Sequence, residues 1–153
     1  MATVEERLAA LGLAVHEVVP PVAAYVPAVV SGRYVYTSGQ LPFVGGKLEA
    51  TGKVGAEVTP ERAAELAAVC ALNAIAAVKS VVPLESVVRV VKVVGFVASA
   101  PGFTGQPGVV NGASNLLLAA FGDAGAHARS AVGVAVLPLD APVEVELIVE
   151  VAR

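Results

Sequence analysis

The stretch from Val87 to Ala98 constrains the fold of this chain most, because most of its positions are apolar and many are β-branched. A strand points alternate residues to its two faces, so apolar residues on both faces require cover on both sides. One parity carries Val88, Val90, Val94 and Phe96, and the other carries Val91, Val93 and Val97. We therefore predict a strand over residues 87–98 that is buried on both faces.

Helix signals stand on either side of this strand. Thr59-Pro60-Glu61 supplies a capping hydroxyl, a proline at the first helical position and a carboxylate at the positive end of the helix dipole. This pattern predicts a helix that runs to about Val81. A second helix is predicted after a loop over residues 99–108, from Val109 to Phe121, where Gly122 ends it.

The remaining segments predict a short helix and several more strands. Thr3 and Glu6 are spaced as in a capping box and predict a helix at about residues 3–12. The last strand, Val143 to Val151, alternates apolar residues with Glu144, Glu146 and Glu150. Four shorter strands are predicted at residues 15–19, 33–38, 47–50 and 131–137.

Composition supports this arrangement. Hydrophobic residues make up 56% of the 153 and charged residues 15%, which excludes a disordered chain. The 32 Val and 29 Ala favour thin strands packed on Ala-rich helices. The predicted class is α+β: a single domain over residues 1–153, with a mixed sheet and two main helices packed on one face. The other face needs cover, which a second subunit would supply.

Charge and cysteine content exclude several classes of partner. A net charge of −3, with isolated Lys and Arg, provides no basic stripe for nucleic acid. Although the mean hydropathy is +0.77, no uncharged run is long enough to span a bilayer, and the first residues do not resemble a signal peptide. We expect a cytoplasmic protein with no membrane partner. With Cys70 alone and only His16 and His127, neither an internal disulfide nor a metal site is expected.

Three side chains stand where they could serve chemistry, and each also has an ordinary structural interpretation. Arg129 begins an apolar strand, where its guanidinium could bind a carboxylate, pair with a neighbouring acid or lie in solvent. Glu144 could act on a proton or be a solvated strand residue, as Glu146 and Glu150 beside it suggest. Ser38 has no base near it in the sequence, so a hydroxyl that satisfies a strand end is favoured over a nucleophile.

Two motifs together resemble a known family. The first runs from Arg129-Ser130 through Leu137-Pro138 to Val143-Glu144-Val145-Glu146, and the second is Tyr34-Val35-Tyr36-Thr37-Ser38-Gly39-Gln40-Leu41-Pro42. They resemble the Rid family of reactive intermediate deaminases, also called YjgF or L-PSP endoribonuclease-like proteins. Asn73 also matches. The N-terminal helix and the segment 111–115 (Asn-Gly-Ala-Ser-Asn) are similar to a longer branch of about 150 residues.

The resemblance implies a chorismate-mutase-like fold, a homotrimer with clefts between subunits, and a hydrolase that needs no cofactor. Its substrates would be enamines and imines such as 2-aminoacrylate, converted to 2-keto acids and ammonia. The site residues it implies are Arg129, which binds the substrate carboxylate, Glu144, which positions or activates water, and Tyr25, Ser38, Gly39 and Asn111, which line the pocket.

One position departs from the family pattern. Ala131 stands where better-known members have a cysteine, so the implied pocket loses a thiol and keeps the arginine clamp. This difference bears on substrate range more than on binding.

Two other functions are compatible with the same fold. One is a non-catalytic trimer that binds small carboxylates or partner proteins, and the other, which the acidic pI of about 5.3 disfavours, is a ribonuclease. Deamination itself is undemanding, because an iminium carbon is already electrophilic and needs only an anchor, a proton carrier and water.

Overall fold

A computed structural model describes residues 1–18, 21 and 23–152 of the chain. Its main sheet has the order β1-β2-β7-β5-β6, in which β5 and β6 are parallel and the other neighbouring pairs are antiparallel. The strands are β1 (Ala28–Ser31), β2 (Tyr34–Thr37), β5 (Val87–Ala98), β6 (Ala128–Val134) and β7 (Val143–Val151). This mixed sheet confirms the α+β class, and β5 and β7 span the predicted residues.

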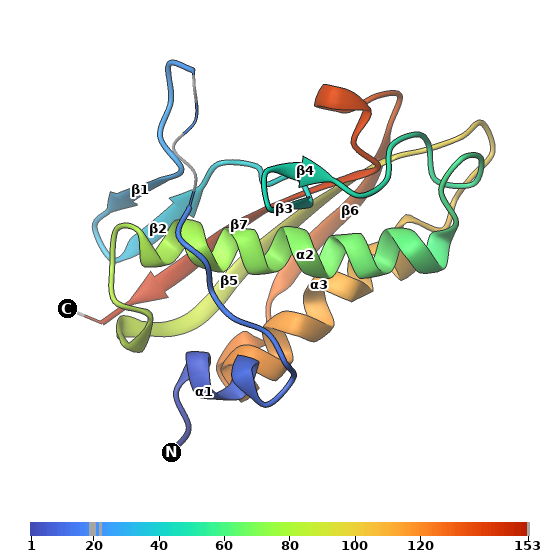
Figure 1. The fold of residues 1–153 in the computed structure, drawn as a ribbon. Coiled ribbons are helices and arrows are strands. Elements are labelled where there is room, and N and C mark those ends of the chain that lie inside the picture. The colour runs from blue at the N-terminus through green and yellow to red at the C-terminus, as the bar shows by residue number, and fades with distance from the viewer. Residues whose placement is uncertain (19–20, 22, 153) are drawn as a thin grey trace.

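The helices lie on one face of the sheet, as predicted (Figure 1). Thr3 and Glu6 form the expected capping box before α1 (Val4–Ala9), and the Thr59 hydroxyl caps α2 (Pro60–Lys79). The third helix, α3 (Gln106–Phe121), packs beside α2. Short 3-10 helices occupy Leu84–Ser86, Gly122–Gly125 and Pro138–Asp140, and a small hairpin joins β3 (Phe43–Val44) to β4 (Lys47–Leu48). Within the described residues, no helix is long and apolar enough to cross a bilayer.

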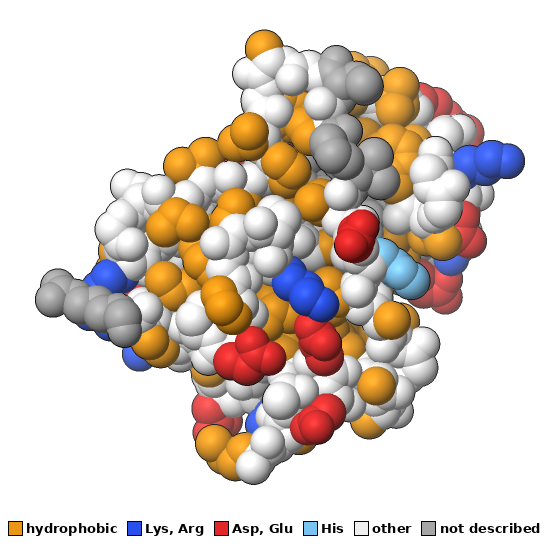
Figure 2. Space-filling model, turned by 60° about the vertical axis from the view of Figure 1, so that its left-hand side comes forward, with side chains coloured by type: hydrophobic (Ala, Val, Ile, Leu, Met, Phe, Trp, Pro, Cys, Tyr) orange, Lys and Arg blue, Asp and Glu red, His pale blue; other side chains and the backbone are white. Residues whose placement is uncertain are grey.

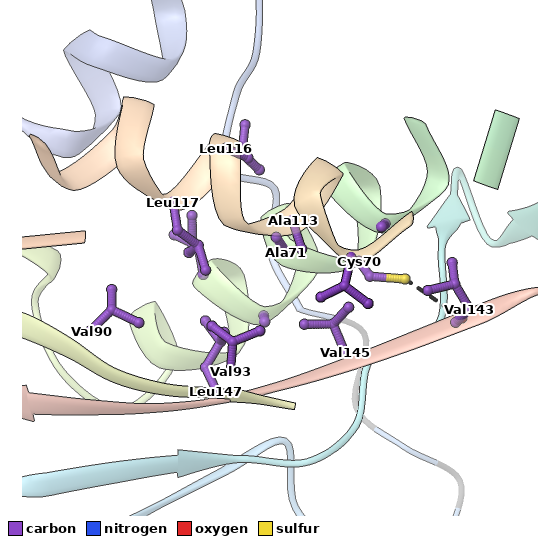
Figure 3. Packing of buried hydrophobic residues seen from close by; sticks show 14 of the residues in the cluster. Cys70, Ala71, Val90, Val93, Ala113, Leu116, Leu117, Val143, Val145 and Leu147 are labelled. Carbon is purple, nitrogen blue, oxygen red and sulfur yellow. Dashed lines mark hydrogen bonds between the residues drawn. The ribbon is translucent and has the colours of Figure 1, made fainter. Parts of the chain in front are cut away.

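The core lies between the sheet and helices α2 and α3. Figure 3 shows Val93 and Leu147 of the sheet facing side chains of both helices, among them Cys70 and Leu117. Glycine allows the closest approaches: a Cβ on Gly112 of α3 would lie 1.9 Å from the carbonyl oxygen of Ala64 in α2. A Cβ on Gly95 of β5 would similarly lie 2.5 Å from Val110 of α3. Helix α3 is thus held against α2 and β5 at two points that have no room for a side chain.

The strand predicted at residues 15–19 is wrong over the described part, 15–18; residue 19 lies outside the described residues. These residues join no strand ladder, and Val15 and Val18 instead pack individually on the core. The first strand of the sheet is β1 at residues 28–31, which forms a hairpin with β2 through Gly32 and Arg33. A hydrophobic run that contacts the core without pairing was indistinguishable from a short strand by pattern alone.

Other boundaries differ by a few residues. Helix α3 begins at Gln106 rather than Val109, because Pro107 suits the first turn of a helix. Strand β6 covers 128–134 rather than 131–137, since its pairing with β5 starts at Lys92 opposite Ala128. The strands predicted at 33–38 and 47–50 are shorter, at 34–37 and 47–48.

The prediction that β5 is buried on both faces is wrong for the single chain. A register shift between Val90 and Lys92 changes the alternation, so that Val90 joins Val93 and Val97 in the core. The face of the sheet away from the helices is uncovered, and Val88 is 43% exposed. By register this open face carries Val29, Tyr34, Tyr36, Val94, Phe96, Val132 and Ile148, together with charged residues of β5 and β7.

The contact at Gly112 generates a test of the packing. We expect Gly112→Ala to destabilise the protein by about 1–3 kcal/mol, because the new methyl group meets backbone that cannot rotate away. Gly108→Ala in the same helix is the matched control, since nothing lies within 4 Å of a Cβ there. Urea unfolding of the two variants measures the difference. Equal stabilities would show that the helices do not touch at Gly112.

Candidate active site

Arg129 is the second residue of β6, and its half-buried side chain extends toward α3. Its Nη1 donates to the Ser114 hydroxyl at 3.2 Å and its Nη2 to the carbonyl oxygen of Pro107 at 3.1 Å. Among the described residues, no carboxylate forms an ion pair with it. The guanidinium is therefore anchored by neutral groups, and further N–H groups remain for a ligand.

A short hydrogen-bonded chain continues behind Arg129. The Ser114 hydroxyl lies 2.8 Å from Nε2 of His127, and Nδ1 of His127 lies 2.6 Å from the carbonyl oxygen of Gly125. Ser114 is only 9% exposed and His127 is half-buried. These polar groups connect α3 to the turn at Gly122–Gly125 and to the start of β6, where Arg129 lies.

Asn111 lies on α3, the helix that supplies both hydrogen-bond partners of Arg129. It follows Pro107 by four residues and precedes Ser114 by three, so all three residues share one face of α3. Asn111 is exposed. The structure thus brings Asn111 and Arg129, both predicted site residues, to one place.

The loops before β1 and after β2 form a second group. The Ser38 hydroxyl donates to the carbonyl oxygen of Val26 at 2.6 Å, and the Ser38 amide donates to that of Pro27 at 2.8 Å. These bonds hold the loop that carries the exposed Tyr25 next to the end of β2. Because its hydroxyl is engaged with backbone, Ser38 is a structural anchor here, as its sequence context favoured.

Gly39 and Glu144 are in direct contact within this second group. A Cβ on Gly39 would lie 2.2 Å from Oε1 of Glu144, so a side chain at residue 39 would displace the carboxylate. Gln40 pairs with Val145 through two backbone hydrogen bonds of 2.8 and 3.1 Å, which fixes this approach. Four of the predicted site residues, Tyr25, Ser38, Gly39 and Glu144, therefore belong to one region.

Burial raises the pKa of Glu144, and the like charge of Glu146 raises it further. The three β7 carboxylates on the open face differ in whether they form ion pairs. Glu150 forms ion pairs with Arg33 at 3.3 Å and Arg89 at 3.8 Å, whereas neither Glu144 nor Glu146 pairs with a base within the described ranges. Glu144 thus combines a raised pKa with the lack of a basic partner among the described residues, which suits a carboxylate that takes and returns a proton.

Asn73 of α2 supports the same region. Its Nδ2 donates to the carbonyl oxygens of Leu41 at 3.0 Å and Phe43 at 3.1 Å. An amide can donate two hydrogen bonds from one nitrogen, so a single side chain fixes the segment that follows Gly39.

The two groups of site residues do not meet within one chain. Arg129 lies opposite Val93 of β5 and Glu144 lies opposite Phe96, so β5 separates them and their side chains point to opposite faces. Strand spacing and rise place their backbones about 10 Å apart across the sheet and about 10 Å apart along it. We call the first group the Arg129 half (Asn111, Ser114, Arg129) and the second the Glu144 half (Tyr25, Ser38, Gly39, Glu144).

The described residues hold few side chains of the nitrogen and sulfur types that bind metals, and a single thiol. No group of three or more His, Cys, Asp or Glu side chains there could hold a metal ion. Cys70 is buried, its Sγ lies 3.7 Å from the carbonyl oxygen of Val143, and burial raises the pKa of its thiol. A thiol with a raised pKa is a poor nucleophile.

Residues 5–151 match the profile of a family described as "YjgF/chorismate mutase-like, putative endoribonuclease". The match covers nearly the whole chain. The protein belongs to the YjgF family.

Individual YjgF relatives have about the same length as this chain. Protein TCP17 of Trypanosoma cruzi is 43% identical over 151 residues, covering 96% of this chain and 93% of that protein. The crystal structure of Atu1372 from Agrobacterium tumefaciens, a protein described as having unknown function, is 45% identical with a TM-score of 0.91, covering 99% and 94% of the two chains. A "putative endoribonuclease" from Shewanella oneidensis is 34% identical with a TM-score of 0.94, covering 98% and 100%.

Sequence reasoning missed Ser114 and His127 in this YjgF protein. Ser114 was noted only as part of a segment, and His127 only as a scarce metal ligand. The sequence pattern that could have indicated Ser114 is its spacing: Asn111 follows Pro107 by four residues and Ser114 follows Asn111 by three, which puts all three on one helix face. Helix α3 was predicted to begin after Pro107, so that face was not apparent.

The raised pKa of Glu144 predicts how stability changes with pH. The folded chain holds the Glu144 proton more tightly than the unfolded chain, so ionisation at rising pH lowers the free energy of unfolding. Glu144→Gln should therefore stabilise the protein at pH 7, and the gain should vanish below about pH 4, where both states of the wild type are protonated. Thermal melts from pH 3 to 8 measure it. Glu150→Gln, which removes ion pairs, is the control and should give no gain; a gain for Glu144→Gln that is independent of pH would contradict the assignment.

Proposed function

We propose that this protein hydrolyses small imines and enamines of 2-amino acids to 2-keto acids and ammonia. The observation that carries the proposal is the guanidinium of Arg129, which is anchored by neutral groups and has no carboxylate partner among the described residues. A guanidinium in this state can bind a planar carboxylate through two charge-assisted hydrogen bonds.

The reaction divides between the two halves of the site. Arg129 binds the substrate carboxylate and leaves the adjacent iminium carbon open to attack. Glu144 takes a proton from water as the C–O bond forms and returns it to the nitrogen of the resulting carbinolamine. As the C–N bond breaks, Glu144 takes the proton of the carbinolamine hydroxyl and passes it to the departing ammonia. The products are a 2-keto acid and ammonium, so the atoms and charges balance without a redox step or cofactor. An enamine enters the same route once its carbon is protonated to give the imine.

Because one chain separates Arg129 from Glu144, the proposal requires two copies to build one site. The Arg129 half lies at the β6 edge, whereas the Glu144 half lies on the β1–β2 side of β5. A homotrimer in which the open sheet faces pack together would cover the apolar residues of that face and let the halves of neighbouring chains meet. The exposed fractions of Val29 (52%), Tyr36 (45%) and Val132 (44%) support such cover.

The alternative functions share this fold and are distinguished by assay. A trimer that only binds small carboxylates would use Arg129 and leave Glu144 without a role. A ribonuclease would need a basic surface, and Figure 2 shows no continuous patch of Lys and Arg on the face it presents. Generating 2-aminoacrylate or an amino-acid-derived imine in situ and following keto-acid release tests deamination directly. Carboxylate binding by calorimetry without acceleration, over a range of side chains, would favour the binding protein.

Variants of Arg129 and Glu144 test their separate roles. Arg129→Ala removes the charge and Arg129→Lys removes the fork, and each should lower kcat/KM by about ten- to a hundredfold, the equivalent of about 1.5–3 kcal/mol. Glu144→Gln keeps the shape and should lower kcat while substrate binding stays largely intact. Steady-state kinetics with circular dichroism as a folding check measures both. Full activity in all three variants would show that neither residue acts in catalysis, and unfolding of Arg129→Ala would show that Arg129 serves structure.

A substitution on the open face of the sheet tests whether the protein assembles into a trimer. We expect a trimer at micromolar concentration, and Val132→Asp should weaken it because a carboxylate would be buried at the contact without a partner. Leu118→Asp is the matched control, since Leu118 is 42% exposed on the helix layer. Sedimentation velocity measures both. A wild-type monomer at this concentration would refute the assembly and, with it, the shared site.

A further inference from the structure

The guanidinium of Arg129 is backed by groups that form one continuous line. From the backbone outward, the line runs through the carbonyl oxygen of Gly125, the ring of His127, the hydroxyl of Ser114 and Nη1 of Arg129. Its three separations are 2.6, 2.8 and 3.2 Å. Two members, Ser114 and His127, play no part in the reaction proposed above.

The direction of each hydrogen bond in this line follows from the chemistry of its ends. A carbonyl oxygen only accepts, so Nδ1 of His127 carries a proton and donates to Gly125. In the neutral ring, Nε2 then has a lone pair and accepts the Ser114 hydroxyl proton. The lone pairs of Ser114 Oγ are thereby left to accept from Arg129, which can only donate.

We propose that Ser114 and His127 are positioning residues that fix the orientation of the Arg129 guanidinium for binding a carboxylate. This inference rests on the proposed function in one respect, that Arg129 is the carboxylate anchor. The argument is geometric: binding a carboxylate with both arms requires a guanidinium plane held in one orientation, while a free arginine side chain samples many. Ser114 holds one arm, the carbonyl oxygen of Pro107 holds the other, and His127 keeps the Ser114 hydroxyl from turning its proton toward the arginine.

Ser114→Ala tests the first link. The arginine keeps its charge and its bond to Pro107 but loses the fixed plane, so KM should rise about two- to tenfold, as expected for one hydrogen bond, with kcat changed less. A role in folding alone would lower stability and leave KM unaltered. Ser80→Ala is the control, because it removes a hydroxyl that bonds only the carbonyl of Ala77 at the end of α2.

Two variants of His127 separate its two bonds. His127→Gln can place an amide oxygen where Nε2 accepts from Ser114, but loses the donor to Gly125. His127→Asn can keep a donor to Gly125, but leaves Ser114 without its acceptor. If the ring acts through Ser114, KM for His127→Gln should stay closer to wild type than KM for His127→Asn. The reverse order would mean that His127 serves only to anchor the turn at Gly125.

The ring also gives a spectroscopic signature. Proton–nitrogen correlation spectra of the imidazoles should show that the neutral form of the His127 ring has its proton on Nδ1, with the signals assigned by their absence in His127→Gln. In Ser114→Ala the proton should stay on Nδ1, because the carbonyl oxygen of Gly125 still accepts it, while the chemical shift of Nε2 should change because the hydroxyl that donates to that nitrogen is gone. A wild-type ring protonated on Nε2 alone would overturn the proposed direction of the hydrogen bonds.

A binding measurement keeps this inference distinct from deaminase activity. Calorimetry with pyruvate, a small 2-keto acid, reports the carboxylate anchor without any turnover. Weaker binding by Ser114→Ala than by wild type supports positioning, even if the wild type shows no deaminase activity and the proposed function fails. Equal binding by the two proteins overturns the positioning role, and so does a wild type that binds no pyruvate, because Arg129 would then anchor no carboxylate.

Discussion

Helix α3 can approach α2 and β5 as closely as it does because glycine stands at both contacts, Gly112 against Ala64 and Gly95 against Val110. A methyl group at either position would push the helix outward, since protein interiors are close-packed and cannot absorb the added volume without strain. The position of α3 in turn decides where Pro107, Asn111 and Ser114 lie. Close packing in the core therefore fixes the surroundings of Arg129 at the surface.

In the Glu144 half, backbone and amide hydrogen bonds rather than apolar packing fix the geometry. Ser38 anchors to Val26 and Pro27, Gln40 pairs with Val145, and Asn73 holds the segment at residues 41–43. Gly39 is thereby held against Glu144. Burial in this setting, with the like charge of Glu146, raises the pKa of the carboxyl group. The raised pKa therefore has two sources: the burial of Glu144, and the alternation of β7, which puts Glu146 on the same face.

Much of the fold could be predicted where local chemistry was decisive. The caps at Thr3 and Thr59 begin helices as expected, and the alternation over residues 143–151 marks a strand with one buried face. The pattern failed at Val15–Val18 and at Val90, where the answer depended on whether a partner strand was present and on a register shift. Strand pairing and register depend on residues that are distant in the sequence, so a local pattern does not reveal them.

The roles of the candidate site residues stay predictions, but their grouping in space can be compared with the sequence. The motifs located Arg129 and Glu144, and the structure groups Asn111 with the first and Tyr25, Ser38 and Gly39 with the second. Which face of the sheet each residue uses depends on the pairing of β5 with β6 and β7. The polar line through Ser114 and His127 escaped prediction because it joins residues from a helix and a turn.

The placement of Arg129 and Glu144 on opposite faces also limits how their encounter could be controlled. A strand paired in a sheet cannot turn over without breaking its ladder of backbone hydrogen bonds, so no hinge or lid within one chain can bring the two side chains together. Loop closure, a common means of gating an enzyme, is therefore ruled out for this pair. Any regulation that brings Arg129 and Glu144 together would have to act on the association of whole chains. Dilution alone would then be enough to separate the two side chains.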